Sequence, residues 1–320
     1  MPLRLLAAGK TDVGLQREQN EDAFHTQVMD GSPSSGVFIV SDGMGGYHAG
    51  EIASQIAVET ISGELASLLD PNVPSPTVKL TKGRGGRKRT KSGKKDTTLA
   101  ESATNETGAE TTTETAAAND GAEVPEVPEA AETQQLFETV ALEHYAGKLN
   151  EAIKNGNAAI VSYGDSHREA RGLGATVTAA LIVEGQAFIA NLGDSRTYLV
   201  RDGKIERVTR DHSLVERLVE MEQITPDEVY EHPSRNLIYR SLGAGHSEVD
   251  VDIFIERLQP GDTLLLCCDG LWEMIRDPEL LRIITETEDV EQACERLIAT
   301  ANANGGEDNI TAVLVRCVEA

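Results

Sequence analysis

The sequence contains few cysteines and few aromatic residues. Only 4 cysteines occur in 320 residues, and two of them, Cys267 and Cys268, are adjacent within an apolar run. This usage excludes a disulfide-stapled miniprotein and is typical of buried thiols in a reducing compartment. Because aromatic residues make up only 4% of the chain, the core has to be built mainly from aliphatic side chains.

Basic residues and long hydrophobic runs are also scarce. The 29 Lys and Arg are outnumbered by 53 Asp and Glu, and the net charge of −24 argues against DNA or RNA as the main ligand. No run approaches the roughly 20 apolar residues that span a bilayer. Arg4 and Lys10 also interrupt the N-terminal stretch, where a signal peptide would need an apolar core. We therefore expect a cytoplasmic protein without a membrane segment.

The composition changes abruptly between residues 71 and 134. Nine Lys and Arg and no acid occupy 79–95, whereas ten Asp and Glu and no base occupy 96–133. Large apolar side chains are nearly absent, so the segment cannot bury enough surface to offset its ordering entropy. We predict one domain over residues 1–320, interrupted by a disordered low-complexity insertion at 71–134. Its basic run could contact nucleic acid, an acidic partner or the protein's own surface, although a solvated linker is the simpler interpretation.

The remaining sequence shows both helical and strand periodicity. Apolar residues at steps of three to five predict helices over residues 51–69, 136–162, 277–286 and 289–304. Alternating or continuous apolar runs predict strands over residues 176–184, 186–192, 196–201, 204–209, 249–256, 262–268 and 309–317. The Asp202-Gly203 pair between two of these strands is typical of a hairpin. Because strands and helices are grouped rather than strictly alternating, we expect an α+β fold of antiparallel sheets covered by helices.

Acidic residues recur next to strand patterns. Four such motifs occur: Glu21-Asp22, Asp42-Gly43, Asp269-Gly270 and Asp308-Asn309. A single Asp-Gly pair is more often an ordinary turn, but two of these pairs directly follow strongly apolar strands. Carboxylates that converge at strand ends repel one another unless a cation compensates, and oxygen ligands select Mg²⁺ or Mn²⁺. The combined pattern predicts a metal centre.

Around these motifs the sequence resembles the PPM or PP2C-type metal-dependent Ser/Thr protein phosphatases in their bacterial form. The motifs that carry the resemblance are TDVGLQREQNEDAF (11–24), VSDGMGGYHAGEIAS (40–54), GLGATVTAAL (172–181), NLGDSRTYLVRDG (191–203), TRDHS (209–213), HPSRNLIYRSLG (232–243), GDTLLLCCDGLWE (261–273) and GGEDNITAVLV (305–315). They run in family order and leave out only the insertion. The resemblance implies a central sandwich of two antiparallel sheets flanked by helices, in the layer order α-β-β-α.

The resemblance also implies a centre of two Mn²⁺ or Mg²⁺ ions. Asp42 resembles the carboxylate that bridges the ions, and Gly43 the residue that offers its backbone carbonyl to the second ion. Asp269 and Asp308 resemble the remaining direct ligands of the first ion.

Further acidic residues extend this implied ligand set. Glu21 and Asp22 resemble the pair that reaches the ions directly or through water. A third, weaker ion has two alternative ligand sources in relatives. These correspond to Asp194 and Glu273, or to Glu169 just before the Gly-x-Gly-x-Thr turn.

The implied activity is hydrolysis of phosphoserine and phosphothreonine by direct attack of a water held between the two ions. Arg17 resembles the family's phosphate-binding arginine, whose guanidinium fork suits a phosphoryl group. Departure of the substrate oxygen requires an acid. Many bacterial relatives carry His directly after Gly-Met-Gly-Gly, whereas this chain has Tyr47 there and His48 one place later. The acid is therefore either His48 or a water on the metal.

Two further features bear on function. Ala175 replaces a Thr that relatives often carry, while Thr176 is retained. Because this turn packs near the implied centre without ligating it directly, we expect the replacement of Thr by Ala175 to have a modest effect. Residues 212–240 resemble the mobile flap that shapes substrate preference, and a structural helical hairpin is the alternative interpretation.

An alternative function is a catalytically weak relative that acts as a phosphoprotein-binding or metal-binding regulatory module. The expected partners are phosphorylated proteins, with a cognate Ser/Thr kinase and its substrates among them. We expect a monomer.

Overall fold

A computed structural model describes residues 3–29, 32–45, 49–69 and 129–320, and for residues 129–140 it describes the backbone alone. The chain divides into a compact unit of residues 1–76 and 141–320 and a second unit of residues 77–140. The following description concerns the first unit unless stated otherwise. Most of the predicted insertion, residues 71–128, lies outside the described residues.

Two antiparallel sheets form the centre of the first unit. The five-stranded sheet has the order β1 (Leu3–Asp12), β12 (Ile310–Glu319), β11 (Thr263–Cys267), β7 (Arg196–Arg201) and β8 (Lys204–Arg207). The seven-stranded sheet has the order β10 (Asp252–Arg257), β6 (Gln186–Leu192), β5 (Val177–Val183), β3 (Ser32–Met44), β4 (Gly174–Ala175) and β9 (Leu242–Gly243), with β2 (Asp22–Met29) paired to β3. The ends of the chain meet because β1 pairs with β12 from Leu3–Glu319 to Asp12–Ile310.

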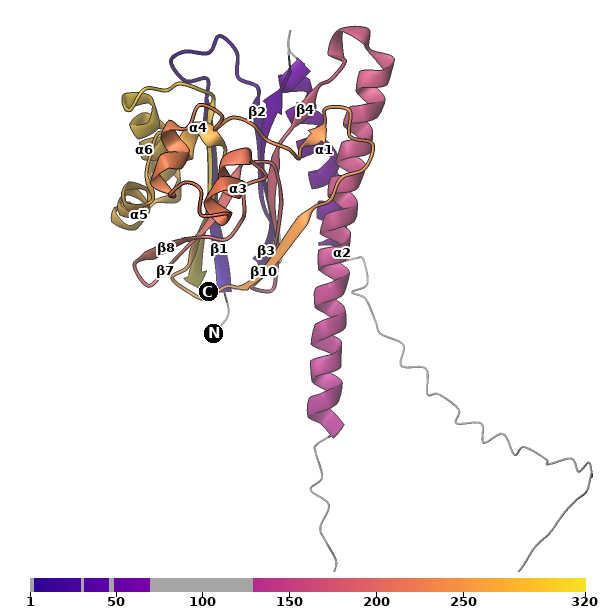
Figure 1. Cartoon of the computed structure of the whole chain (residues 1–320). Coiled ribbons are helices and arrows are strands. Elements are labelled where there is room, and N and C mark those ends of the chain that lie inside the picture. The colour runs from indigo at the N-terminus through magenta and orange to yellow at the C-terminus, as the bar shows by residue number, and fades with distance from the viewer. Residues whose placement is uncertain (1–2, 30–31, 46–48, 70–128) are drawn as a thin grey trace, which may run out of the picture. The chain divides into compact units, whose positions relative to one another are not determined.

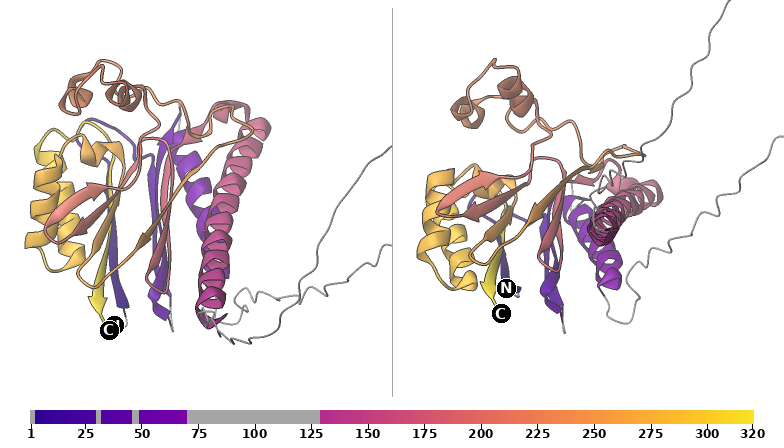
Figure 2. Two further views of the ribbon diagram at one scale, coloured as in Figure 1. Left: turned by 60° about the horizontal axis from the view of Figure 1, so that its bottom comes forward. Right: turned by 90° about the horizontal axis from the view of Figure 1, so that it is seen from below.

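Helices cover the outer face of each sheet. The long helices are α1 (Ala49–Leu68), α2 (Glu129–Ser166), α5 (Asp277–Glu286) and α6 (Val290–Ala303). The short ones are α3 (Leu214–Glu220), α4 (Asp269–Trp272) and the 3-10 helices η1 (Arg168–Ala170) and η2 (Asp227–Glu231). Figure 1 and Figure 2 show α5 and α6 against the five-stranded sheet, and α1 with residues 141–166 of α2 against the seven-stranded sheet. The predicted α-β-β-α sandwich is confirmed.

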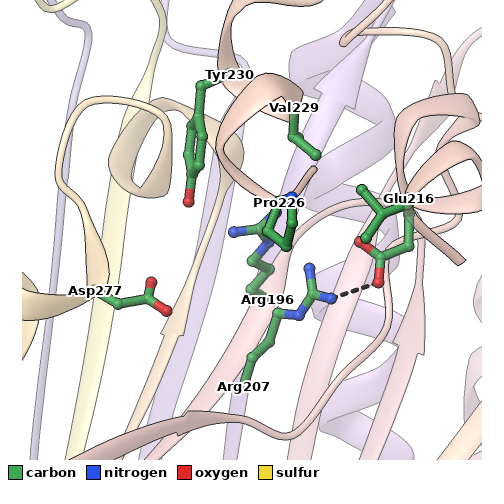
Figure 3. Close-up of a pocket in the computed structure, with 8 residues that line it drawn as sticks. Arg196, Arg207, Glu216, Pro226, Val229, Tyr230 and Asp277 are labelled. Carbon is green, nitrogen blue, oxygen red and sulfur yellow. Dashed lines mark hydrogen bonds and ion pairs between the residues drawn. The ribbon is translucent and has the colours of Figure 1, made fainter. Parts of the chain in front are cut away.

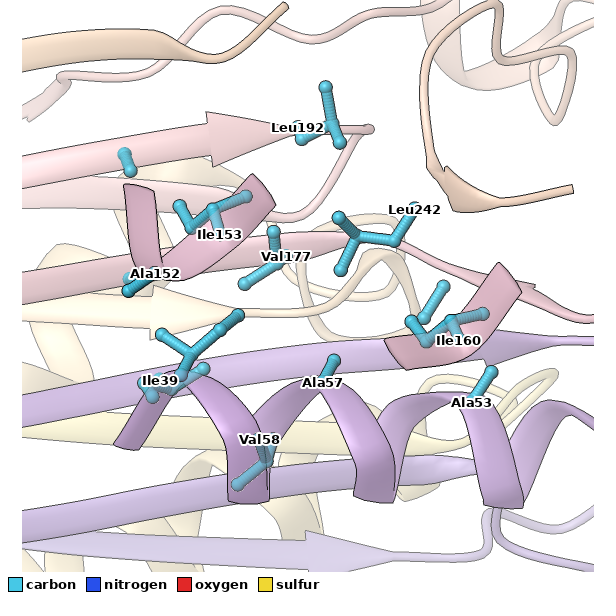
Figure 4. Packing of buried hydrophobic residues seen from close by; sticks show 14 of the residues in the cluster. Ile39, Ala53, Ala57, Val58, Ala152, Ile153, Ile160, Val177, Leu192 and Leu242 are labelled. Atoms are coloured by element: carbon cyan, nitrogen blue, oxygen red, sulfur yellow. The ribbon is translucent and has the colours of Figure 1, made fainter. Parts of the chain in front are cut away.

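Aliphatic side chains fill each layer, as the shortage of aromatic residues requires. Phe38 of β3 and Leu266 of β11 belong to the fully buried cluster between the sheets. Outside the seven-stranded sheet, Ala53 and Ala57 of α1 belong to a second buried cluster that the helices share with the sheet (Figure 4). Ile153 of α2 is fully buried in the cluster that contains Ala53 and Ala57.

The structure differs from the sequence-based expectations mainly at element ends. Helix α2 begins at Glu129, so residues 129–134, which we assigned to the disordered insertion, have a helical backbone. Low apolar content suggested disorder there, but the run is rich in Ala, Glu and Gln, which favour helix. The strand expected over 176–184 corresponds to β5, which is one residue shorter at each end, and β4 precedes it as a separate short strand.

Two N-terminal strands were not predicted. β1 and β2 lack strict alternation, and most of their residues are only partly buried. β1 and β2 form strands because they pair with β12 and β3. β12 is distant from β1 in the sequence, and only part of β3 is an apolar run. Among the described residues, no helix is both long enough and apolar enough to cross a membrane.

We expect Ile153→Ala to lower the free energy of unfolding by about 3 kcal/mol, because it leaves a cavity between α2 and the seven-stranded sheet. Urea unfolding followed by circular dichroism measures this change. The matched control is Lys154→Ala on the exposed face of the same helix, which should change stability by less than about 0.5 kcal/mol. Equal effects of the two substitutions would contradict the packing described here.

Candidate metal centre

Strand ends bring the predicted acidic residues together at one end of the sandwich, close to α4 in Figure 1. Asp22 at the start of β2 lies directly opposite Asp42 near the end of β3. Asp269 begins α4 immediately after β11 and Cys268, and Asp308 stands just before β12. Asp194 lies in the turn between β6 and β7. The architecture thus gathers carboxylates from both sheets.

These carboxylates raise one another's pKa. Burial, followed by the negative charges of Asp269 and Asp22, raises the pKa of Asp42 well above its usual range. Burial, followed by the charges of Asp194 and Asp308, does the same to the pKa of Asp269. Burial raises the pKa of Asp22 to about 6, although a hydrogen bond from Thr311 opposes the rise. Asp22, Asp42 and Asp269 are therefore buried carboxyl groups whose ionisation is disfavoured in the absence of a cation.

Two carboxylate oxygens in this cluster have no partner. Asp22 Oδ1 and Asp269 Oδ1 are buried, and no hydrogen bond within the described residues satisfies them. A buried carboxylate oxygen without a donor is costly unless a cation lies beside it. Together with the mutual repulsion, these oxygens fit a divalent cation bound by hard oxygen ligands.

Asp308 has a different partner in this structure. Arg17, whose side chain is half exposed, donates from Nη2 to Asp308 Oδ2 at 2.5 Å. Within the described parts of the chain, no three His, Cys, Asp or Glu side chains are gathered closely enough to ligate one ion together. The carboxylates are thus close enough to affect one another's pKa. They are not close enough in this structure to bind one ion together.

Gly43 and Glu21 are fixed by close backbone packing. The Gly43 N–H donates to Glu21 O at 3.1 Å, and a Cβ on Gly43 would lie 2.1 Å from Gly50 O. Only glycine therefore fits at this position. Burial raises the pKa of the Glu21 carboxyl, while the charge of Arg17 and the N–H of Gly50 in the first turn of α1 oppose the rise.

The predicted ligands of a third ion lie in two different environments. Burial and the charge of Asp211 raise the pKa of Asp194 to about 7. Glu273 lies close enough to Asp194 and Asp269 to raise their pKa values, and it accepts a hydrogen bond from Arg235 Nε at 3.2 Å. Glu169, in contrast, is exposed in η1, and no hydrogen bond or ion pair described here joins it to the cluster.

His48 lies outside the described residues. Thr176 contacts the backbone of the acidic cluster, because its Oγ1 accepts the N–H of Asp42 at 3.2 Å. Ala175 is buried in β4, where it pairs with Gly43.

Two supporting residues were missed from the sequence. Thr311 Oγ1 donates to Asp22 Oδ2 at 2.6 Å, and the side-chain carbonyl of Asn309 accepts the N–H of Glu21 at 2.8 Å. Both follow Asp308 in the run Asp-Asn-Ile-Thr. Because alternate residues of a strand share one face, their spacing is a signal that could have identified them.

The predicted flap, residues 212–240, contains the short helices α3 and η2. A cavity of about 230 Å³ lies beside them (Figure 3). Its charged walls are largely neutralised, since Arg196 Nη2 pairs with Asp211 Oδ2 at 2.7 Å and Arg207 pairs with Glu216.

A buried stack connects this cavity to the acidic cluster. The Arg196 guanidinium lies 3.4 Å from the ring centroid of Trp272, and Trp272 Nε1 donates to Asp194 O at 3.0 Å. The flap itself is joined to the cluster by Arg235, which also pairs with Glu307 Oε2 at 3.3 Å. Ion pairs of Arg235 therefore join the predicted flap to Glu273 and Glu307 beside the acidic cluster.

Comparison with known proteins identifies phosphatases as relatives of this chain. The model of the protein phosphatase 2C family matches residues 15–315. The chain is 31% identical over 306 residues to the serine/threonine phosphatase stp of Listeria monocytogenes, covering 96% of this chain and 93% of that protein. It is 28% identical over 317 residues to the phosphatase PstP of Mycobacterium tuberculosis, covering 99% of this chain and 46% of that protein.

Solved structures agree with this relationship. The crystal structure of the Mycobacterium tuberculosis phosphatase PstP/Ppp gives a TM-score of 0.69 at 28% identity and covers 99% of both chains. Stp1 from Staphylococcus aureus gives a TM-score of 0.69 at 28% identity, covering 100% of this chain and 98% of that chain. The sandwich therefore has the fold of bacterial serine/threonine phosphatases. The chain belongs to the protein phosphatase 2C family.

The raised pKa values predict an unusual pH dependence of stability without metal. The pKa values of Asp22 and Asp194 rise from 3.8 to about 6 and about 7 on folding, so the folded state binds protons more tightly than the unfolded state. Their destabilising effect is absent below both pKa values and grows as pH rises from about 4 to about 7. In EDTA, wild type should therefore lose stability relative to Asp194→Asn between about pH 4 and about pH 7.

Thermal unfolding of both proteins at each pH measures this difference. Excess Mn²⁺ should raise the wild-type midpoint more at the higher pH, because protonated carboxylates do not ligate metal. A difference between wild type and variant that is independent of pH would show that Asp194 is not under electrostatic strain.

Proposed function

We propose that this protein is a Ser/Thr protein phosphatase that hydrolyses phosphoserine and phosphothreonine with the help of divalent metal ions. The observation that carries the proposal is the buried cluster of mutually repelling carboxylates, with Arg17 at its edge. One of the related structures is described as the PstP catalytic domain in complex with two manganese ions, and it gives a TM-score of 0.67 at 27% identity. Similarity to that domain supports a divalent-metal requirement here.

The residues that would hold Mn²⁺ or Mg²⁺ are those gathered at the acidic end of the sandwich. Asp42, the carbonyl of Gly43, Asp269 and Asp308 are the proposed direct ligands, and Asp22 and Glu21 support them directly or through water. Such ions activate water for attack on phosphorus and neutralise charge that develops on the phosphoryl group. Asp194 and Glu273 are the proposed ligands of a third ion. Glu169 is the weaker alternative, because it is exposed and has no described contact with the cluster.

Arg17 would change partner between states. In this structure its guanidinium is paired with Asp308. When Asp308 turns to a cation, the guanidinium becomes free to bind a phosphate through its planar pair of N–H groups. The half-exposed position of Arg17 allows a phosphorylated side chain of another protein to reach it.

Two finer points complete the proposal. His48 is the proposed proton donor to the departing Ser or Thr oxygen, and a water is the alternative donor. The substrates are proposed to be phosphoproteins produced by a cognate Ser/Thr kinase, with the kinase itself among them. Comparison of phosphoproteomes with and without the active protein tests the second point.

Asp269→Asn should abolish most Mn²⁺-dependent hydrolysis of p-nitrophenyl phosphate while leaving the protein folded. Loss of a residue that merely supports a ligand typically costs 10–100-fold, so loss of a direct ligand should cost more than about 100-fold. The matched control is the exposed Asp165→Asn at the end of α2, which should keep the wild-type rate. Near-wild-type turnover of Asp269→Asn would remove Asp269 from the ligand set. Absence of turnover by wild type across metals and pH would favour the regulatory binding module instead.

Arg17→Ala should raise KM for the same substrate by roughly tenfold or more, because a charge-assisted bidentate contact to phosphate is lost. Steady-state kinetics at saturating Mn²⁺ measure KM and kcat separately. Arg168→Ala, at an exposed position in η1, is the control and should leave both constants unchanged. An unchanged KM for Arg17→Ala would exclude Arg17 from phosphate binding.

A further inference from the structure

Asn309 holds the loop that carries Arg17 and Glu21. The residue is buried, with only 5% of its surface exposed. The side-chain carbonyl accepts the N–H of Glu21 at 2.8 Å, and the side-chain amide donates to Val13 O at 3.0 Å and to Gln19 O at 2.8 Å. One amide thus binds backbone groups before and after Arg17.

The same loop is pressed against the segment that precedes Asn309. Gly14 has a φ of +80°, and a Cβ there would lie 2.2 Å from Asp308 O, so only glycine allows this approach. Leu15 donates its N–H to Gly306 O at 2.8 Å. The loop over residues 13–21 therefore has a defined position on the turn that carries Asp308.

Asn309 also orients Asp308 through its own backbone. The Asn309 N–H donates to Asp308 Oδ1 at 2.8 Å, which leaves Oδ2 directed to Arg17. Asn309 thus holds the loop that carries the Arg17 guanidinium and also orients the Asp308 carboxylate that faces it. Burial of the amide and complete use of its donors and acceptor make this arrangement rigid.

We propose that Asn309 is a positioning residue that sets the place of Arg17 for phosphate binding, without itself touching the substrate. This inference rests on the proposed phosphatase function. Loss of the amide would leave the overall fold intact but free the 13–21 loop, and the guanidinium would then spend less time in its binding position. The consequence is a defect in substrate affinity that acts through Arg17.

The chain supplies a matched control in Asn157. Its side chain is also buried, with 2% exposed, and its carbonyl accepts the N–H of Gly243 at 2.8 Å while its amide donates to His246 O at 3.0 Å. This amide fixes the turn around β9 and has no described contact with the 13–21 loop. Asn157→Ala therefore reproduces the loss of a buried amide without touching the loop.

The kinetic test compares Asn309→Ala and Asn157→Ala with p-nitrophenyl phosphate at saturating Mn²⁺. We expect Asn309→Ala to raise KM roughly tenfold with a smaller change in kcat, since misplacement of a binding group by about 1 Å can cost up to 100-fold. Asn157→Ala should leave KM within about twofold of wild type, because none of its described hydrogen bonds involves the 13–21 loop. Equal KM values in the two variants would overturn the proposal.

A double variant separates positioning from general damage. If Asn309 acts through Arg17, Asn309→Ala should cause little further rise in KM when Arg17 is already Ala. Multiplicative effects of the two substitutions would overturn the proposal. Inactivity of wild type would instead refute the proposed phosphatase function, so the two failures are distinguishable.

Amide hydrogen exchange of the wild-type protein provides a readout that requires neither turnover nor a folded variant. The Glu21 N–H should be protected to a degree similar to that of the Gly243 N–H, because each donates to a buried side-chain carbonyl. Rapid exchange of the Glu21 amide beside a protected Gly243 amide would show that Asn309 does not hold the loop, and would overturn the proposal.

Discussion

Repulsion among buried carboxylates at one end of the sandwich is the constraint on which the site depends. Asp22, Asp42 and Asp269 are brought together by strands of both sheets, and the charges of Asp269 and Asp22 raise the pKa of Asp42. The fold tolerates this cost because the strand pairings, with their buried aliphatic cores, fix the positions of the backbone. Electrostatic cost at such a site is typical of a centre that requires a cation.

Neutral polar side chains and the buried guanidinium of Arg196 hold the segments that carry the carboxylates in place. Thr311 and Asn309 hold Asp22 and the loop that carries Arg17, while Thr176 holds the backbone of Asp42. On the opposite side, Arg196 is paired with Asp211 and stacked on Trp272. Such supporting contacts orient ligands and are often as important for affinity as the ligands themselves.

Predictions from the sequence succeeded where a local pattern was strong. Helix α5 was predicted with its observed bounds, 277–286, and α6 within one residue at each end, because both are amphipathic and short. β1 and β2 were missed since their partly buried residues show no clear period, and their conformation comes from ladders with other strands. The acidic cluster was predicted from motifs next to apolar strands, but the exposed position of Glu169 could not be read from them.

The sequence by itself determined the alternation and grouping of strands and helices, the aliphatic core and the identity of the acidic residues, because these depend on local periodicity and composition. Only the tertiary structure decided which of those residues meet. The pairing of Arg17 with Asp308 and the contacts of Asn309 join residues nearly three hundred positions apart, as the antiparallel pairing of β1 with β12 requires. Contacts over such distances depend on which strands pair, and local periodicity does not identify the partner of a strand.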